Sequence, residues 1–187
     1  MAANKKIVRI VVIGPESTGK STLCHELADH YQSVWCPEFA RAYLMEHGMQ
    51  YTYDDLLTIA KGQLALEDEY AAALLQQESN NTHNRIPLFI DTNMYVMKVW
   101  CEFVFGKCHQ WILDQIVERP YDGYLFCNID LPWVKDELRE YPDLKTREQL
   151  FNIYKDILIN QPLPWFDIKG DAGQRLQAGI DATNKLL

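Results

Sequence analysis

The stretch Gly14-Pro15-Glu16-Ser17-Thr18-Gly19-Lys20-Ser21 matches the pattern G-x-x-x-x-G-K-[ST] at every fixed position. The apolar, β-branched run 7–13 precedes it and predicts a buried strand, while residues 20–31 have helical spacing. Glycines let successive backbone amides curl toward an anion, and the start of a helix adds unpaired N–H groups and a positive dipole. A strand, a glycine-flanked loop and a helix in this order predict a phosphate-binding loop (P-loop) for a nucleoside triphosphate.

The residues of this loop have different expected roles. Lys20 is expected to contact the β- and γ-phosphates of ATP, and the Ser21 hydroxyl is expected to bind Mg²⁺. The other residues expected to contact the nucleotide are Gly14, Glu16, Ser17, Thr18, Gly19 and Thr22. The sequence therefore predicts ATP and Mg²⁺ as cofactors.

Composition limits the remaining possibilities. The 187 residues are 48% hydrophobic, which fits one domain with a full core, so we place no domain boundary within 1–187. The net charge of −8 argues against a nucleic-acid groove and an anionic membrane surface. Five cysteines without a C-x-x-C pair indicate free thiols. With no signal-peptide core and no apolar run near the roughly 20 residues of a membrane span, we expect a soluble, cytoplasmic protein that acts on a small molecule. Nothing in the sequence indicates its oligomeric state.

Short apolar runs alternate with helical patterns along the chain. The expected strands are 7–13, 33–36, 86–91, 124–129 and 165–168. The expected helices are 20–31, 38–44, 53–77, two between 94 and 118 with a break near Gly106, 146–160 and 174–187, and a polar turn is expected at 79–85. This alternation predicts an α/β fold with three layers, in which helices cover both faces of a five-stranded parallel sheet. By analogy with P-loop kinases the strand order is expected to be 2-3-1-4-5, with ligands at the carboxyl ends of the strands.

Asp91 ends the apolar strand 86–91, where P-loop enzymes place a carboxylate beside Mg²⁺. The next residue is Thr92 and not the glutamate that hydrolytic ATPases usually have there, which disfavours a hydrolase. Residues 127–131 follow the fourth strand and lack the Asn-Lys-x-Asp motif with which GTPases recognise guanine. The favoured chemistry is therefore phosphoryl transfer to a small acceptor.

An acceptor hydroxyl needs a carboxylate that orients it and takes its proton. Glu38 follows the second strand and is expected at the same sheet edge as the P-loop. Arg41 lies three residues further on the same helical face, where it could pair with Glu38 or hold a phosphate. We assign the base to Glu38 and the metal carboxylate to Asp91. The exchanged assignment, in which Asp91 contacts the acceptor, stays open, and so does an ordinary Glu38–Arg41 salt bridge.

The connector 130–147 carries several cations on a proline-containing segment. In a phosphoryl-transfer enzyme, a mobile helical lid with this composition brings arginines onto the transferred phosphate and excludes water. We expect Arg139 and Arg147 to act in this way. A solvated helix–loop–helix is the alternative.

The motifs, taken together and in order, resemble the ribosylnicotinamide kinase domain of NadR-type proteins. They are the P-loop with Thr22-Leu23, Glu38-Phe39-Ala40-Arg41, Asp91-Thr92, Gly106-Lys107, and Trp133 with Asp136 and Arg139. The resemblance covers nearly the full length and weakens after about Asn160. It implies ATP-dependent phosphorylation of the 5′-hydroxyl of nicotinamide riboside, which gives nicotinamide mononucleotide. The chain departs from enteric NadR proteins in having no His-x-Gly-His motif, and Asn93 stands where an aspartate is expected.

A flat, positively charged pyridinium ring favours a site with aromatic faces and negative charge. The candidates for this site are Trp100, Trp133 and Tyr43, with Asn93 near the ribose. The loop 169–173 is expected near adenine, because Gly170 allows a close approach of the backbone. Two other functions stay open: a kinase of another nucleoside or nucleotide, and a regulatory protein or ATPase that binds ATP as a switch.

Overall fold

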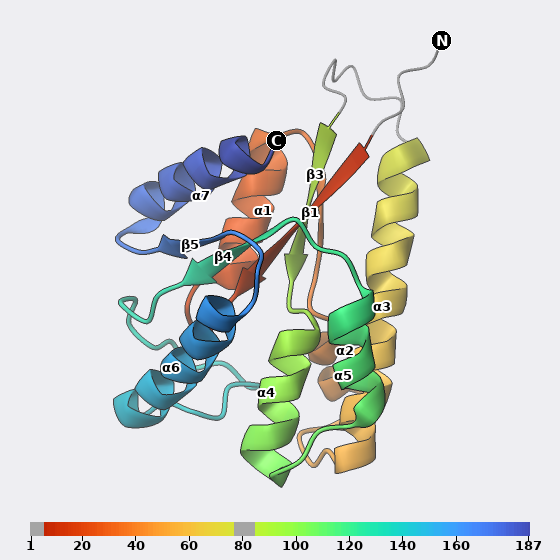
Figure 1. Cartoon of the computed structure of the whole chain (residues 1–187). Helices are drawn as coiled ribbons and strands as arrows, with labels where there is room; N and C mark the ends of the chain where they lie inside the picture. The colour runs from red at the N-terminus through yellow and green to blue at the C-terminus, as the bar shows by residue number, and fades with distance from the viewer. Residues whose placement is uncertain (1–5, 77–84) are drawn as a thin grey trace.

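The computed structural model describes residues 6–76 and 85–187, so the polar turn expected at 79–85 lies almost entirely outside the described residues. Five strands form one parallel sheet, β1 (Lys6–Ile13), β2 (Val34–Cys36), β3 (Arg85–Asp91), β4 (Gly123–Cys127) and β5 (Trp165–Ile168). Their order is β2-β3-β1-β4-β5, which confirms the expected topology (Figure 1).

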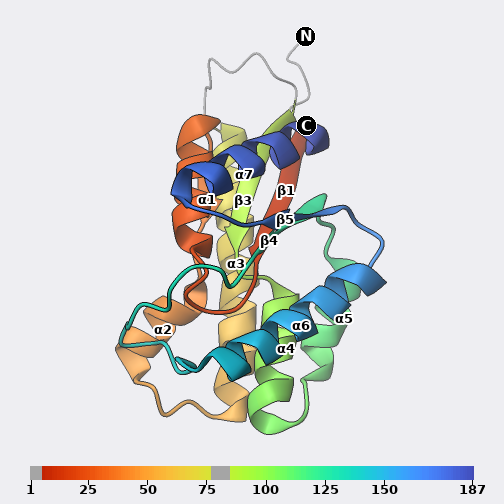
Figure 2. The ribbon, with the colours of Figure 1, turned by 90° about the vertical axis from the view of Figure 1, so that its left-hand side faces the viewer.

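Helices occupy the segments between and after the strands. They are α1 (Lys20–His30), α2 (Phe39–His47), α3 (Tyr53–Gln76), α4 (Met94–Phe105), α5 (Gln110–Glu118), α6 (Leu144–Asn160) and α7 (Ala172–Leu186). Helices α1 and α7 lie side by side on one face of the sheet (Figure 2). Residues of α3, α4 and α6 pack on the opposite face, so the sheet is covered on both sides and the three-layer fold is confirmed.

The composition of β1 explains why the sheet needs both layers. Val8, Ile10 and Val12 point toward α1 and α7, whereas Val11 and Ile13 point toward the opposite helices. All five side chains are fully buried. Alternate residues of a strand face opposite sides of the sheet, so a continuous apolar run is stable only where both sides are covered.

Local signals place several helix ends. Helix α4 begins where the Asn93 side chain accepts a hydrogen bond from the N–H of Tyr95, and it ends at Gly106, which has a left-handed φ of 67°. The Asp143 side chain caps α6, and Asp171 forms a capping box with Gln174 at α7. Because of these two caps, α6 and α7 each begin two residues before the expected positions 146 and 174.

The connector between β4 and α6 differs from the expected lid. It contains turns but no helix before Leu144, so the helical lid expected over 130–147 is helical only from Leu144 onward. Pro132 and Pro142 each lack a backbone donor and disfavour a helical conformation in the preceding residue, which is the physical reason for the difference.

Among the described helices, none combines the length and the apolar composition that a bilayer crossing requires. The cytoplasmic location expected from the sequence stays a prediction.

Candidate active site

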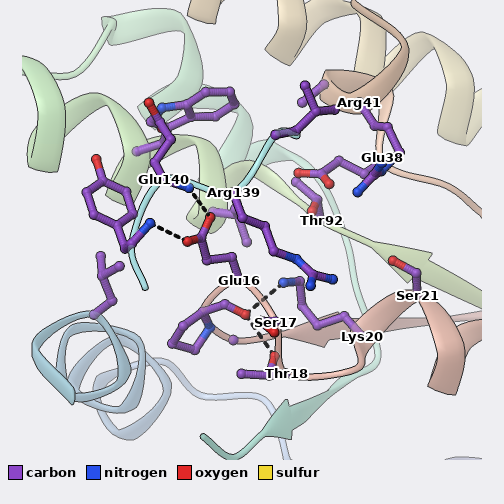
Figure 3. A pocket seen from close by; sticks show the side chains of 18 of the residues that line it. Glu16, Ser17, Thr18, Lys20, Ser21, Glu38, Arg41, Thr92, Arg139 and Glu140 are labelled. Atoms are coloured by element: carbon purple, nitrogen blue, oxygen red, sulfur yellow. Dashed lines mark hydrogen bonds between the residues drawn. The ribbon is translucent and has the colours of Figure 1, made fainter. Parts of the chain in front are cut away.

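The ends of three strands place the expected site residues at one edge of the sheet. The register pairs Val12 of β1 with Asp91 of β3, and Cys36 of β2 with Ile90 of β3. The loops after these strands therefore start at the same level, because parallel strands end at the same edge. The P-loop and Glu38 line one cavity there (Figure 3). Asp91 is not part of this lining but is hydrogen-bonded to Ser21, which is.

The P-loop is closely packed and partly held by its own backbone. Gly14 has a φ of 148°, and a Cβ at this position would lie 2.7 Å from the carbonyl oxygen of Cys127, so a larger residue does not fit. The Thr18 hydroxyl and the Lys20 ammonium both donate to the Pro15 carbonyl, at 2.8 and 2.9 Å. Lys20 therefore lies over the loop, facing the space that a phosphate chain would occupy (Figure 3).

Ser21 and Asp91 form a pair whose chemistry fits Mg²⁺. The Ser21 hydroxyl donates to Asp91 Oδ2 at 2.5 Å, while Asp91 Oδ1 is buried and has no hydrogen-bond partner. Burial raises the pKa of Asp91, and the positive charge of Lys20 and the hydrogen bond from Ser21 oppose this rise. A hydroxyl and a carboxylate with a free oxygen are the kind of ligands that Mg²⁺ accepts beside phosphate oxygens and water. Within 6–76 and 85–187, no cluster of three or more His, Cys, Asp or Glu could hold a metal by itself.

Glu38 lies at the N-terminus of α2 and faces the cavity half-buried. Burial and the neighbouring charge of Asp91 raise the pKa of Glu38, whereas Lys20 and Arg41 lower it. A raised pKa suits a carboxylate that accepts a proton during the reaction. Arg41 also lines the cavity, but its Nη2 donates to Asp136 Oδ2 at 3.0 Å. Among the described residues, Arg41 pairs with Asp136 and forms no ion pair with Glu38, so the alternative Glu38–Arg41 salt bridge is absent.

Thr92 is an additional site residue that its sequence position alone did not reveal. It lines the cavity with 1% of its surface exposed, and its hydroxyl lowers the pKa of the neighbouring Glu38 carboxyl. Its φ of 81° is rare for a β-branched residue and signals a strained backbone. A strained, cavity-lining residue next to Glu38 suits a contact with a bound ligand (Figure 3).

The connector 130–143 is docked on the P-loop by side chains of that loop. The Glu16 carboxylate accepts hydrogen bonds from the backbone N–H groups of Glu140 at 3.0 Å and Tyr141 at 2.5 Å. The Ser17 hydroxyl accepts one from the N–H of Val134 at 2.9 Å. The backbone of the connector is thus held directly over the phosphate-binding loop, which is where the sequence places the lid.

The far end of the cavity is apolar and aromatic. Helix α4 contributes Val96, Val99, Trp100 and Phe103, and Tyr141, Leu150 and Tyr154 complete this wall. Phe103 and Tyr141 meet edge to face with their centroids 5.3 Å apart. Of the three aromatic candidates, Trp100 lies in this wall, and its contact with an acceptor ring stays a prediction. Most other members of the wall carry no local sequence signal.

Several expected site residues lie outside the cavity lining, and their expected contacts stay predictions. The guanidinium of Arg147 is buried in α6 and donates to the Leu131 carbonyl at 3.2 Å, so it holds the connector. The Asn93 side chain is used as the cap of α4. Gly170 binds Asp130 through its N–H at 2.6 Å. Trp133 and Tyr43 also lie away from the lining, whereas Arg139 is part of it.

Arg175 supports the P-loop from behind, a role that no motif indicated. It is 5% exposed and donates to the carbonyls of Thr18, Asn128 and Gly170, each at 2.9 Å. These partners lie far apart in the sequence, so only the folded chain brings them together.

The five-stranded order 2-3-1-4-5, the P-loop after β1 and the Ser21–Asp91 pair define the fold of a P-loop kinase. The family model described as AAA domain (AAA_28) matches residues 9–175, and the chain belongs to this family. Although the family model is named for AAA domains, this chain has Thr92 after Asp91, where hydrolytic ATPases usually have a glutamate.

Comparisons with known proteins confirm the resemblance to NadR-type proteins. The trifunctional NAD biosynthesis/regulator protein NadR of Salmonella typhimurium (strain LT2) is 26% identical over 167 residues, which cover 86% of this chain and 38% of that protein. A solved structure of NadR in complex with NR matches with a TM-score of 0.71 at 20% identity, over 98% of this chain and 50% of that one. The thymidylate kinase of Ehrlichia chaffeensis matches with a TM-score of 0.66 at 13% identity, over 97% of this chain and 100% of that one. The chain thus spans half or less of the NadR chains that it matches.

Proposed function

We propose that this chain transfers the γ-phosphoryl group of ATP to the 5′-hydroxyl of nicotinamide riboside and forms nicotinamide mononucleotide. The observation that carries the proposal is one continuous cavity with the P-loop at one end and the aromatic wall of α4 at the other. Glu38 lies among the residues that line it. A phosphate chain fits the first end, and a flat ring fits the second.

The phosphate end contributes charge and position. The Lys20 ammonium neutralises the negative charge that develops on the transferred phosphoryl group, and the backbone amides of the P-loop orient the β- and γ-phosphates. Arg139 lines the same end and reaches toward Lys20 (Figure 3). The connector above excludes water, so the acceptor hydroxyl is favoured over hydrolysis.

Ser21 and Asp91 are the residues that would hold Mg²⁺, since the free Oδ1 of Asp91 and the Ser21 hydroxyl fit its ligand preference. When bound, the ion supplies charge stabilisation for the phosphate oxygens. Glu38 remains as the carboxylate for the acceptor. It orients the 5′-hydroxyl and takes its proton as the new oxygen–phosphorus bond forms.

The relatives guide the choice of acceptor. NadR of Salmonella typhimurium is named as an NAD biosynthesis and regulator protein, and the matching solved NadR was crystallised with NR. Because the identities are 26% and 20%, the acceptor is the part of the proposal that most needs an experiment.

The test is a chromatographic assay of ADP and nucleotide products with ATP, Mg²⁺ and one acceptor at a time. Nicotinamide riboside, thymidine, thymidylate, deoxyadenosine and water are compared, with Lys20→Ala as the inactive control. We expect stoichiometric ADP and nicotinamide mononucleotide with nicotinamide riboside and little ADP without an acceptor. If the enzyme turned over another nucleoside or nucleotide faster, that molecule would replace nicotinamide riboside as the proposed acceptor. Acceptor-independent ADP release would favour an ATPase or a nucleotide-sensing protein.

A further inference from the structure

Three hydrogen bonds in series join four separate segments around the aromatic end of the cavity. The Trp100 indole N–H in α4 donates to Tyr51 Oη at 2.9 Å, and the Tyr51 hydroxyl donates to Glu140 Oε2 at 2.9 Å. The backbone N–H of Glu140 donates to the Glu16 carboxylate of the P-loop at 3.0 Å. The series therefore connects the aromatic wall, the loop before α3, the connector and the P-loop.

Tyr51 occupies the centre of this series without lining the cavity itself. Its ring meets Trp100 edge to face, with the centroids 5.0 Å apart, and packs in the same way against Phe105 at 6.3 Å. Burial raises the pKa of Tyr51, so its hydroxyl stays neutral and serves as acceptor and donor at once. Both hydrogen bonds meet at the Tyr51 oxygen, and each is 2.9 Å long. The distance from Glu140 Oε2 to the Trp100 indole nitrogen is therefore no greater than the sum of these two lengths.

Glu140 is the carboxylate left for this end of the cavity. The Glu16 carboxylate is engaged by two backbone N–H groups, and Glu38 lies with Lys20 at the phosphate end. Arg139 and Glu140 are neighbours in sequence but extend in opposite directions, Arg139 toward Lys20 and Glu140 away from it (Figure 3). These two connector residues thus place a positive charge toward the phosphate end and a negative charge toward the aromatic wall.

A charged ring and a neutral ring of the same shape should differ in their interaction energy with this aromatic wall. Both gain from packing against the Trp100 indole. Only a cationic ring gains further from the electron-rich indole face and from the carboxylate of Glu140. An anionic acceptor group would be repelled there.

We propose that Glu140, positioned by Tyr51, selects an acceptor whose ring is positively charged over a neutral ring of nearly the same shape. The inference rests on the proposed function, since it takes the acceptor ring to lie against Trp100. Glu140 is then a specificity-determining residue, and Tyr51 is a positioning residue that acts through it.

Oxidised and reduced nicotinamide riboside are a suitable pair of probes, because the ribose is the same and the ring changes from cationic to neutral. The measurement is kcat/KM for each form at saturating ATP and Mg²⁺. Glu140→Gln keeps an acceptor for the Tyr51 hydroxyl but removes the charge, so we expect the preference for the oxidised form to fall about fivefold, the scale of one exposed ion pair. The loss should appear in KM for the oxidised form, with kcat and the KM for ATP unchanged.

Tyr51→Phe keeps the ring against Trp100 and removes only the hydroxyl, so the preference should fall by a smaller factor and the tryptophan emission should shift. Glu137→Gln is the matched control, because this connector carboxylate is also exposed and does not line the cavity. An unchanged preference in Glu140→Gln, in an enzyme that phosphorylates the oxidised form, would refute the inference and leave the proposed function standing. A wild-type enzyme that phosphorylates neither form would overturn the proposed function itself.

Discussion

Replacing Glu16 with alanine should release the connector from the P-loop. The half-buried Glu16 carboxylate accepts the N–H of Glu140 at 3.0 Å and that of Tyr141 at 2.5 Å, and alanine removes both acceptors. A hydrogen bond to a charged group contributes roughly 1.5–3 kcal/mol when it is buried. With about 1 kcal/mol for each bond at this partly solvated position, the closed connector loses about 2 kcal/mol, which corresponds to a roughly thirtyfold change in its opening equilibrium.

Amide hydrogen exchange at Glu140 and Tyr141 measures this opening directly, because both amides are the donors of the lost bonds. We expect both to exchange roughly thirtyfold faster in Glu16→Ala. Glu16→Gln keeps one uncharged acceptor oxygen and should give an intermediate rate. Glu46→Ala is the surface control on α2 and should leave both amides at the wild-type rate.

Wild-type exchange rates at both amides in a folded Glu16→Ala protein would refute the claim that Glu16 holds the connector on the P-loop. The Ser17–Val134 bond at 2.9 Å and the Arg41–Asp136 ion pair at 3.0 Å would then be sufficient to hold the connector. A melting temperature close to that of the wild type is expected in either case, because Glu16 contacts no core side chain through these bonds.

The parts of this molecule that could be predicted from the sequence depend on local patterns. The P-loop is a continuous motif, and the strands show as short apolar runs, so their topology follows from the class of fold. Glu38 and Asp91 could be placed at one edge because each follows a strand, and parallel strands end together. The cavity indeed brings the P-loop and Glu38 together, with Asp91 bound to Ser21.

The parts that could not be predicted depend on contacts between distant segments. Arg139 and Arg147 are equally cationic in the sequence, and both donate to backbone carbonyls of the connector, Arg139 to Val134 and Arg147 to Leu131. Only Arg139 also lines the cavity, whereas Arg147 is buried outside it. The path of the connector is held by Glu16 and Ser17, which lie more than a hundred residues earlier. For the same reason Tyr51, whose partners are 49 and 89 residues away, carries no sequence signal.

Three further predictions concern the base, the connector and a buried carboxylate. Glu38→Gln should lower kcat by about 10²–10⁴-fold at an unchanged Mg²⁺ requirement, and rescue by excess Mg²⁺ in a metal titration would move the base to another residue. Arg139→Lys should lower kcat because lysine lacks the planar fork, whereas Arg147→Lys should lower the melting temperature first, since Arg147 is 4% exposed and lies outside the cavity lining. A kcat loss in Arg147→Lys at an unchanged melting temperature would contradict this division. Burial raises the pKa of Glu67 from 4.5 to about 7, and the ion pair with Arg119 at 3.2 Å and the hydrogen bond from the Tyr121 hydroxyl oppose this rise only in part. Between these two values the folded chain holds a proton that the unfolded chain has lost. The stabilisation that comes from this bound proton is therefore fully present below pH 4.5 and is lost as the pH rises through 7. The free energy of unfolding falls by about 3 kcal/mol at most over this range. Glu67→Gln should remove that fall in urea-unfolding experiments across this range, whereas Glu69→Gln, an exposed neighbour on α3, should keep it. Parallel stability curves for wild type and Glu67→Gln would show that the buried carboxyl does not titrate on unfolding.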